Sequence, residues 1–199
     1  MLPPCRRSPP AYGGGRRGTR SGIRAPGAPR VGSYALSEHG RTVLIDPLAP
    51  EGDGGFWEQL DGVVSGAVAC LITIGYHLRS AEEAAARYPD ATVWGHRSVA
   101  RRMADRSPYR ELSPEQTPAG VRAFAIGNPR RAELPVLVES HAAVAFGDAV
   151  VGTGGGLRVW CNEPIDARRR RFYAERFAPT LTPILRERFD HVLPWYHRG

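Results

Sequence analysis

The sequence predicts an α+β fold, a four-layer αββα sandwich in which two mixed β-sheets are flanked by helices. Apolar residues make up 42% of the 199 residues and charged residues 24%, which is typical of a globular chain. The first half alternates strand and helix patterns, and the second half has a series of short strands followed by helices. Two such halves, each with helices on one side, predict two sheets covered by helices.

The first thirty residues differ in composition from the rest of the chain. They are rich in Gly, Pro and Ser, and they contain no acidic residue but seven arginines: Arg6, Arg7, Arg16, Arg17, Arg20, Arg24 and Arg30. The net charge of +7 comes from this segment, because the other arginines balance the 20 acidic residues. With so little to bury, residues 1–30 are predicted to be a disordered tail, and residues 31–199 a single domain.

The domain begins with a β-hairpin pattern. Residues 31–36 and 42–46 are short apolar runs, and the polar residues 37–41 between them contain a glycine. Residues 67–74 follow as a continuous apolar run, typical of a strand buried on both faces. Ser80 and Glu83 then match a capping box, which predicts a helix that ends at Pro89. A strand at 92–94 and a short helix at 98–104 complete this half.

The second half contains more strand patterns. Short extended runs separated by turn residues predict strands at 121–126, 134–138, 142–146 and 157–160. Helices are predicted at 167–177 and 182–189, before a last strand at 191–194. The glycine run 152–156 precedes a strand pattern rather than a helix, so it indicates a hairpin turn and not a phosphate-binding loop. The run Arg168–Arg171 would point all round a helix, which favours a solvated face or a local anion patch over a nucleic-acid site.

Composition also restricts the compartment and the partners. Cys5, Cys70 and Cys161 lie far apart, which indicates neither a disulfide framework nor a zinc knuckle. We therefore expect a cytoplasmic protein. No stretch approaches the ~20 apolar residues of a membrane-spanning helix. Neither a membrane nor a nucleic-acid partner is expected.

In this order, the segments resemble the metallo-β-lactamase-fold superfamily. The motifs that carry the resemblance best are the strand end Leu44-Ile45-Asp46-Pro47, which follows the hairpin, and Gly147-Asp148, which follows an apolar strand. The resemblance covers residues 31–199 and implies the αββα fold. Family members hold a pair of divalent metal ions, usually zinc, and their first ligand motif, T-H-x-H-x-D-H, follows a buried strand.

Most ligand positions of the family carry other residues in this chain. Thr73 matches the threonine of the motif, and the four ligand positions that follow it are occupied by Ile74, Tyr76, Leu78 and Arg79. Asn128 occupies the next ligand position, Asp148 the bridging aspartate, and either Tyr196 or His197 the final histidine. Isoleucine and leucine offer no lone pair, and arginine is a permanent cation. A catalytic zinc needs about three protein ligands, so the resemblance implies a degenerate site.

The expected function is that of a non-catalytic or weakly catalytic pseudoenzyme that binds a ligand. Without a metal-bound hydroxide, no catalytic residue and no cofactor are expected. The residues expected to line its cleft are Ile74, Tyr76, His77, Leu78, Arg79, Asn128, Asp148 and Tyr196. Arg79 either pairs with Asp148 in place of the metal or points to solvent. Arg130 and Arg131 either attract an anionic small molecule or are simply solvated.

Two other functions fit the sequence. In the first, His77, Asp148 and His197 hold one zinc or iron ion, and the chain is a metal-dependent hydrolase of esters or thioesters, similar to glyoxalase II or a lactonase. A bulge could move His77 into such a position, whereas a histidine beside Tyr76 otherwise forms a hydrogen-bonded wall. In the second, the fold is a scaffold for an interaction surface, to which the four tryptophans could contribute.

Overall fold

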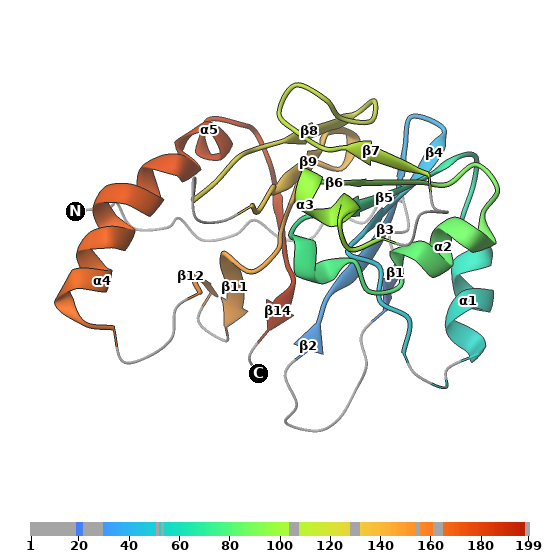
Figure 1. Ribbon diagram of the computed structural model, residues 1–199, viewed down its shortest axis with the longest axis horizontal. Coiled ribbons are helices and arrows are strands. Elements are labelled where there is room, and N and C mark those ends of the chain that lie inside the picture. Colours follow the sequence, from blue (N-terminus) through green and yellow to red (C-terminus); the bar gives the residue numbers. More distant parts are fainter. Residues whose placement is uncertain are drawn as a thin grey trace.

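Two layers of β-sheet form the centre of the molecule, and helices cover the outer face of each layer (Figure 1). The computed structural model describes residues 19–21, 30–50, 52, 54–103, 108–127, 132–153, 156–160 and 165–197. The layer order is αββα, as the sequence predicts.

The first layer is a six-stranded sheet in the order β1-β3-β4-β5-β6-β7. Its strands are β1 (Thr19–Ser21), β3 (Ser33–Glu38), β4 (Arg41–Ile45), β5 (Val68–Ile72), β6 (Thr92–Gly95) and β7 (Tyr109–Glu111). The first three strands pair antiparallel, and β4 to β7 pair parallel. The predicted hairpin is confirmed, with a turn of only two residues, His39 and Gly40, both of which have positive φ. The predicted central strand is also confirmed, since every residue of β5 is buried.

The second layer consists of two four-stranded sheets. One has the order β13-β10-β9-β8 and the other β12-β11-β14-β2. Their strands are β8 (Val121–Ala123), β9 (Val136–Val138), β10 (Ala143–Phe146), β13 (His191–Pro194), β2 (Arg30–Val31), β11 (Val150–Thr153), β12 (Gly156–Val159) and β14 (Tyr196–His197). β10 runs parallel to β13, and β11 runs parallel to β14.

This second layer differs from the single sheet that the sequence predicts. The chain passes from β10 to β11 through Gly147, Asp148 and Ala149, and from β13 to β14 through Trp195 alone. These four residues lie outside the strands. In both segments, the chain therefore leaves the β-ladder of one four-stranded sheet before it joins the ladder of the other. Asp148 and Trp195 therefore stand where the second layer is interrupted.

Helices cover the outer faces. The first layer is covered by α1 (Gly54–Asp61), α2 (Ala81–Arg87) and α3 (Arg97–Ala100). The second layer is covered by α4 (Ala167–Phe172), the π-helix η3 (Tyr173–Phe177), the 3₁₀-helix η4 (Ala178–Leu181) and α5 (Thr182–Leu185). Two further 3₁₀ turns, η1 (Gly75–His77) and η2 (Glu139–His141), lie in connections. No helix in the described part of the chain is long and apolar enough to cross a bilayer.

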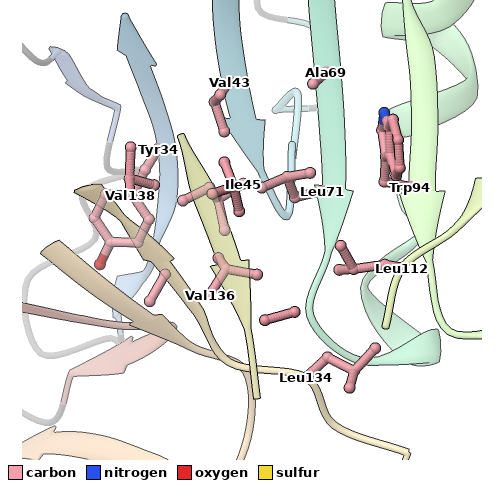
Figure 2. Close-up of a cluster of buried hydrophobic side chains, with 13 residues drawn as sticks. Tyr34, Val43, Ile45, Ala69, Leu71, Trp94, Leu112, Leu134, Val136 and Val138 are labelled. Carbon is pink, nitrogen blue, oxygen red and sulfur yellow. The ribbon is translucent and has the colours of Figure 1, made fainter. Parts of the chain in front are cut away.

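The main core lies between the two layers. Figure 2 shows Ile45 and Leu71 of the first layer beside Val136 of the second. Side chains alternate along each strand, so Val43 and Ile45 face this core while Leu44 faces α1 and α2. Cys70 also faces the helices, and burial raises the pKa of its thiol to about 12, which makes it unreactive.

Several local predictions need correction. Ser80 precedes α2, but its hydroxyl accepts a hydrogen bond from the Ala49 amide at 3.0 Å instead of capping the helix. The sequence analysis also missed α1, β7 and β11. Helix α1 begins at Gly54-Gly55, which are poor helix formers, and β7 is a short edge strand.

Two short strands lie within the segment predicted to be disordered. Thr19–Ser21 (β1) runs along the edge of β3, and Arg30 belongs to β2, which pairs with β14. Residues 1–18 and 22–29 lie outside the described residues. The disorder of that remainder and the domain boundary at residue 31 therefore stay predictions.

Candidate functional site

Polar side chains from both layers meet at one end of the sheets. Asp46 directly follows β4, and Thr73 directly follows the neighbouring strand β5. The chain then enters η1, which carries His77. Parallel neighbours end at the same edge of a sheet, so these side chains start from adjacent positions. Asp148 and Trp195 reach them from the interruption in the second layer.

Asp46 is the buried acceptor of this site. Only 2% of its surface is exposed. Its Oδ1 accepts the Thr73 amide at 2.8 Å, and its Oδ2 accepts the Thr73 hydroxyl at 2.5 Å. The residue has a φ of 46°, a left-handed conformation that aspartate tolerates better than most residues. The end of β4, the left-handed backbone of Asp46 and the two hydrogen bonds from Thr73 together hold the carboxylate in one orientation.

His77 bridges two carboxylates, and we call this arrangement the Asp46–His77–Asp148 bridge. Its Nδ1 lies 2.8 Å from Asp46 Oδ2, and its Nε2 lies 3.3 Å from Asp148 Oδ1. Burial by itself lowers the pKa of the imidazole, but the bonds to Asp148 and Asp46 outweigh it and raise the pKa above its usual 6.5. Each ring nitrogen thus faces a carboxylate, an arrangement that favours the protonated ring.

An aromatic ring and an arginine accompany the bridge. The Trp195 ring lies 4.6 Å from the His77 ring at an angle of 33°, and the Arg79 guanidinium lies 4.8 Å from the Trp195 ring. Burial is the main influence on Arg79 and lowers the pKa of its guanidinium, while Asp46 and Asp148 act in the opposite direction. Both cations of the site thus lie against one indole ring.

The hypothesis of an Arg79–Asp148 pair stays a prediction. Among the described residues, the imidazole of His77 contacts Asp148, with Nε2 3.3 Å from Oδ1. Arg79 has a φ of 36°, its guanidinium lies over Trp195, and its buried Nη1 has no hydrogen-bond partner among the described residues. Arg79 does not point freely into solvent, because its guanidinium interacts with both carboxylates through space.

Gly147 allows Asp148 to come this close. A Cβ atom at residue 147 would lie 2.7 Å from Thr73 Oγ1 and 3.1 Å from Ile74 Cγ2. Side chains do not tolerate a contact of 2.7 Å, so the backbone beside Asp148 can approach β5 only as glycine. The Gly147-Asp148 motif thus brings the second layer against the end of the first.

The other predicted site residues are placed as follows. Ile74 is buried beside Gly147, and Leu78 packs against the helices of the first layer. Tyr76 is 69% exposed, with the Arg102 guanidinium over its ring at 4.7 Å. Asn128, Arg130 and Arg131 lie outside the described residues. Tyr196 and His197 form β14, and their side chains lie outside the described part of the chain.

The donor atoms of the described residues do not fit the metal centre that the resemblance implies. Ile74 and Leu78 supply no lone pair, and Arg79 supplies a positive charge. The imidazole of the bridge has both nitrogens directed at carboxylates. In the described part of the chain, no three His, Cys, Asp or Glu side chains form a group that could hold a metal ion.

The sequence analysis missed two residues of this site. Asp46 was noted only as part of a strand motif, although an acid directly after three buried apolar residues is a signal for a buried hydrogen-bonding role. Trp195 gave no such signal, because a tryptophan between two short strands is equally compatible with core packing.

Comparison with known proteins gives the fold. No family model and no curated protein sequence matches the chain. Among solved structures, the metal-soaked Flv1 flavodiiron core from Synechocystis sp. PCC6803 is 13% identical to this chain. The match covers 91% of this chain and 54% of the Flv1 chain, with a TM-score of 0.61. The DIM-1 metallo-β-lactamase exposed to ceftazidime is 13% identical, with coverages of 90% and 84% and a TM-score of 0.60. The di-iron-bound protein TTHA1623 is 17% identical, with coverages of 89% and 91% and a TM-score of 0.58.

These identities support a shared fold and nothing finer. The chain spans about half the length of the flavodiiron structures that it matches.

Proposed function

The chain has the metallo-β-lactamase fold, and we propose that it is a pseudoenzyme of that fold, without the metal-dependent hydrolysis. The observation that carries the proposal is the Asp46–His77–Asp148 bridge. The imidazolium of His77 supplies, between two carboxylates, the positive charge that a metal would otherwise supply. A buried carboxylate without a cation costs several kcal/mol. A positive charge on His77, in place of a metal ion, would therefore explain how Asp46 and Asp148 coexist in one site.

Loss of the metal removes the nucleophile. A zinc-bound water reaches a pKa near ~7, whereas no described group of this site can activate water in that way. His77 is poorly placed to act as a general base, because each of its ring nitrogens already faces a carboxylate. Any hydrolytic activity is therefore expected to be weak and independent of Asp148.

The ligand that we propose is a small anion. Support comes from Arg79, whose buried Nη1 has no acceptor among the described residues. An unsatisfied buried N–H costs about 1–3 kcal/mol, and a carboxylate or phosphate oxygen would satisfy it. The cytoplasmic location stays a prediction from the cysteine pattern.

Elemental analysis of protein purified without chelator tests the proposal. We expect far less than one zinc or iron ion per chain. A variant that restores the family motif (Ile74→His, Tyr76→His, Leu78→Asp and Arg79→His) serves as the positive control and should bind zinc near stoichiometry. Stoichiometric zinc or iron in the wild type, lost in Asp148→Ala, would overturn the proposal in favour of a one-metal hydrolase.

A hydrolysis screen and a binding assay complete the test. Wild type and Asp148→Ala should show equal, low rates on ester and thioester substrates. Inorganic phosphate or acetate should raise the Tm of the wild type but not that of Arg79→Gln. A rate that Asp148→Ala abolishes contradicts the loss of catalysis, and equal Tm shifts in both proteins contradict the role of Arg79.

A further inference from the structure

Helix α4 is exposed on every side. None of the residues Ala167–Phe172 is buried, and all four arginines at 168–171 are exposed. The sequence argument expected the run Arg168–Arg171 to form a solvated face or a local anion patch, and the structure leaves all four side chains accessible to an anion. The helix lies at the edge of the molecule away from α1 and α2 (Figure 1).

Some exposed arginines have acidic partners, whereas Arg97, Arg101, Arg110 and four arginines on or shortly after α4 have none among the described residues. Arg87 pairs with Asp61, Arg122 with Glu187, and Arg171 with Glu175. Within the described part of the chain, by contrast, no ion pair or hydrogen bond involves the guanidinium groups of Arg168, Arg169, Arg170 or Arg176. We call these four side chains the α4 basic patch.

The α4 basic patch is electrostatically unfavourable in the isolated chain. The first turn of the helix contains no acidic residue, and Asp166 before it accepts the Arg169 amide at 2.7 Å as the N-cap. Cations near a helix N-terminus oppose the helix dipole by roughly 0.3–1 kcal/mol each, and adjacent guanidinium groups repel one another. A polyanion bound to the patch would offset both the unfavourable interaction of the arginines with the helix dipole and the repulsion between their guanidinium groups.

We propose that the α4 basic patch binds the phosphate backbone of a nucleic acid without sequence preference. Guanidinium groups bind phosphate oxygens in a bidentate manner. Arg168 and Arg176 are eight residues apart, roughly 12 Å along a helix, a length that spans about three or four phosphates of one DNA strand. The patch lies on different elements from the Asp46–His77–Asp148 bridge, so this inference is independent of the proposed pseudoenzyme function.

A membrane surface fits the patch less well than a nucleic acid. Helices that lie on membranes insert an apolar face between the lipids. Here the apolar residues of this region are used inside the protein, where Tyr173, Phe177 and Ile184 pack against the second layer. Phe172 is 37% exposed, which leaves too little apolar surface for insertion but is compatible with contact to a sugar or base.

Fluorescence anisotropy with a labelled 20-base-pair DNA duplex tests the inference on the full chain. The test variant carries Arg168→Gln, Arg169→Gln and Arg170→Gln. The control carries Arg97→Gln, Arg101→Gln and Arg110→Gln, three exposed arginines on α3, after it and on β7. Both variants lose the same charge and keep the arginines of residues 1–30, so only the position of the lost charge differs. Circular dichroism should show that both fold as the wild type does.

The expected result is a loss of affinity of roughly tenfold or more for the test variant near 50 mM salt, with the control within about twofold of the wild type. The slope of log K against log salt should also become smaller by about 2–3 for the test variant alone. Equal losses in both variants, or none in either, would overturn the proposal. Binding to phosphatidylserine vesicles in place of DNA, abolished by the test variant, would also overturn it, since it would assign the patch to a membrane.

Discussion

His77 is the residue on which the electrostatics of the site depend. It is 2% exposed, and it has one carboxylate at each ring nitrogen. Asp46 belongs to the first layer and Asp148 to the second, so the ring of His77 links the two halves of the molecule.

Replacing His77 should make the stability of the protein depend less on pH. The folded pKa of His77 lies above 6.5, so the imidazolium stabilises the fold fully below the unfolded pKa, and this contribution is lost as the pH rises through the folded value. Urea unfolding should show His77→Gln to be less stable than wild type by about 3 kcal/mol near pH 6, with a smaller difference near pH 9. His191→Gln, at an exposed histidine, should leave the profile unchanged. A difference that stays constant across this range would contradict the raised pKa.

The interruption between β10 and β11 is the element that places Asp148. A continuous β-ladder would use the backbone groups of residues 147–149 in strand pairing and direct alternate side chains to opposite faces. The chain instead leaves the ladder at Gly147, and the glycine packs against Thr73. The neighbouring strand pair β13 and β14 is interrupted at Trp195, which allows the indole to reach His77. Two breaks in one layer thereby produce the site.

Gly147→Ala should therefore destabilise the protein. The added Cβ would overlap Thr73 Oγ1 at 2.7 Å, and overpacking of this kind typically costs about 1–3 kcal/mol. Gly62→Ala is the matched control, because its Cβ would meet no atom closer than 3.4 Å. Denaturant unfolding of both variants gives the comparison. Equal stabilities for the two alanine variants would show that Gly147 has no packing role.

At the scale of the whole molecule, the layers are joined mainly by apolar contacts. Leu71, Ile45 and Val136 meet in the core between the sheets (Figure 2). The helices add a smaller cluster on each outer face.

Truncation in this core should be far more costly than truncation on the surface. Leu71 is fully buried, and Leu71→Ala should lower the free energy of unfolding by about 2–5 kcal/mol. Leu157 is 54% exposed, and Leu157→Ala should change it by no more than about 0.5 kcal/mol. Thermal or urea unfolding measures both. Similar losses for the two variants would show that the layers are not held by this cluster.

The sequence by itself determined the layered fold and the absence of donors at Ile74 and Leu78. Both follow from local information: apolar periodicity predicts the strands, and an aliphatic side chain has no lone pair in any environment. The hairpin and the buried strand β5 were predicted for this reason, and Ser80 was mispredicted because its hydroxyl bonds to a distant segment, at Ala49.

Only the tertiary structure decided which side chain lies between Asp46 and Asp148. The sequence left open whether Arg79 pairs with Asp148 or points to solvent, and it could not show that His77 lies between two carboxylates contributed by residues 46 and 148. The partners of a buried charge depend on the packing of segments that are far apart in the chain. The pairing at such a site is therefore decided by the approach of the two layers, which no local pattern records.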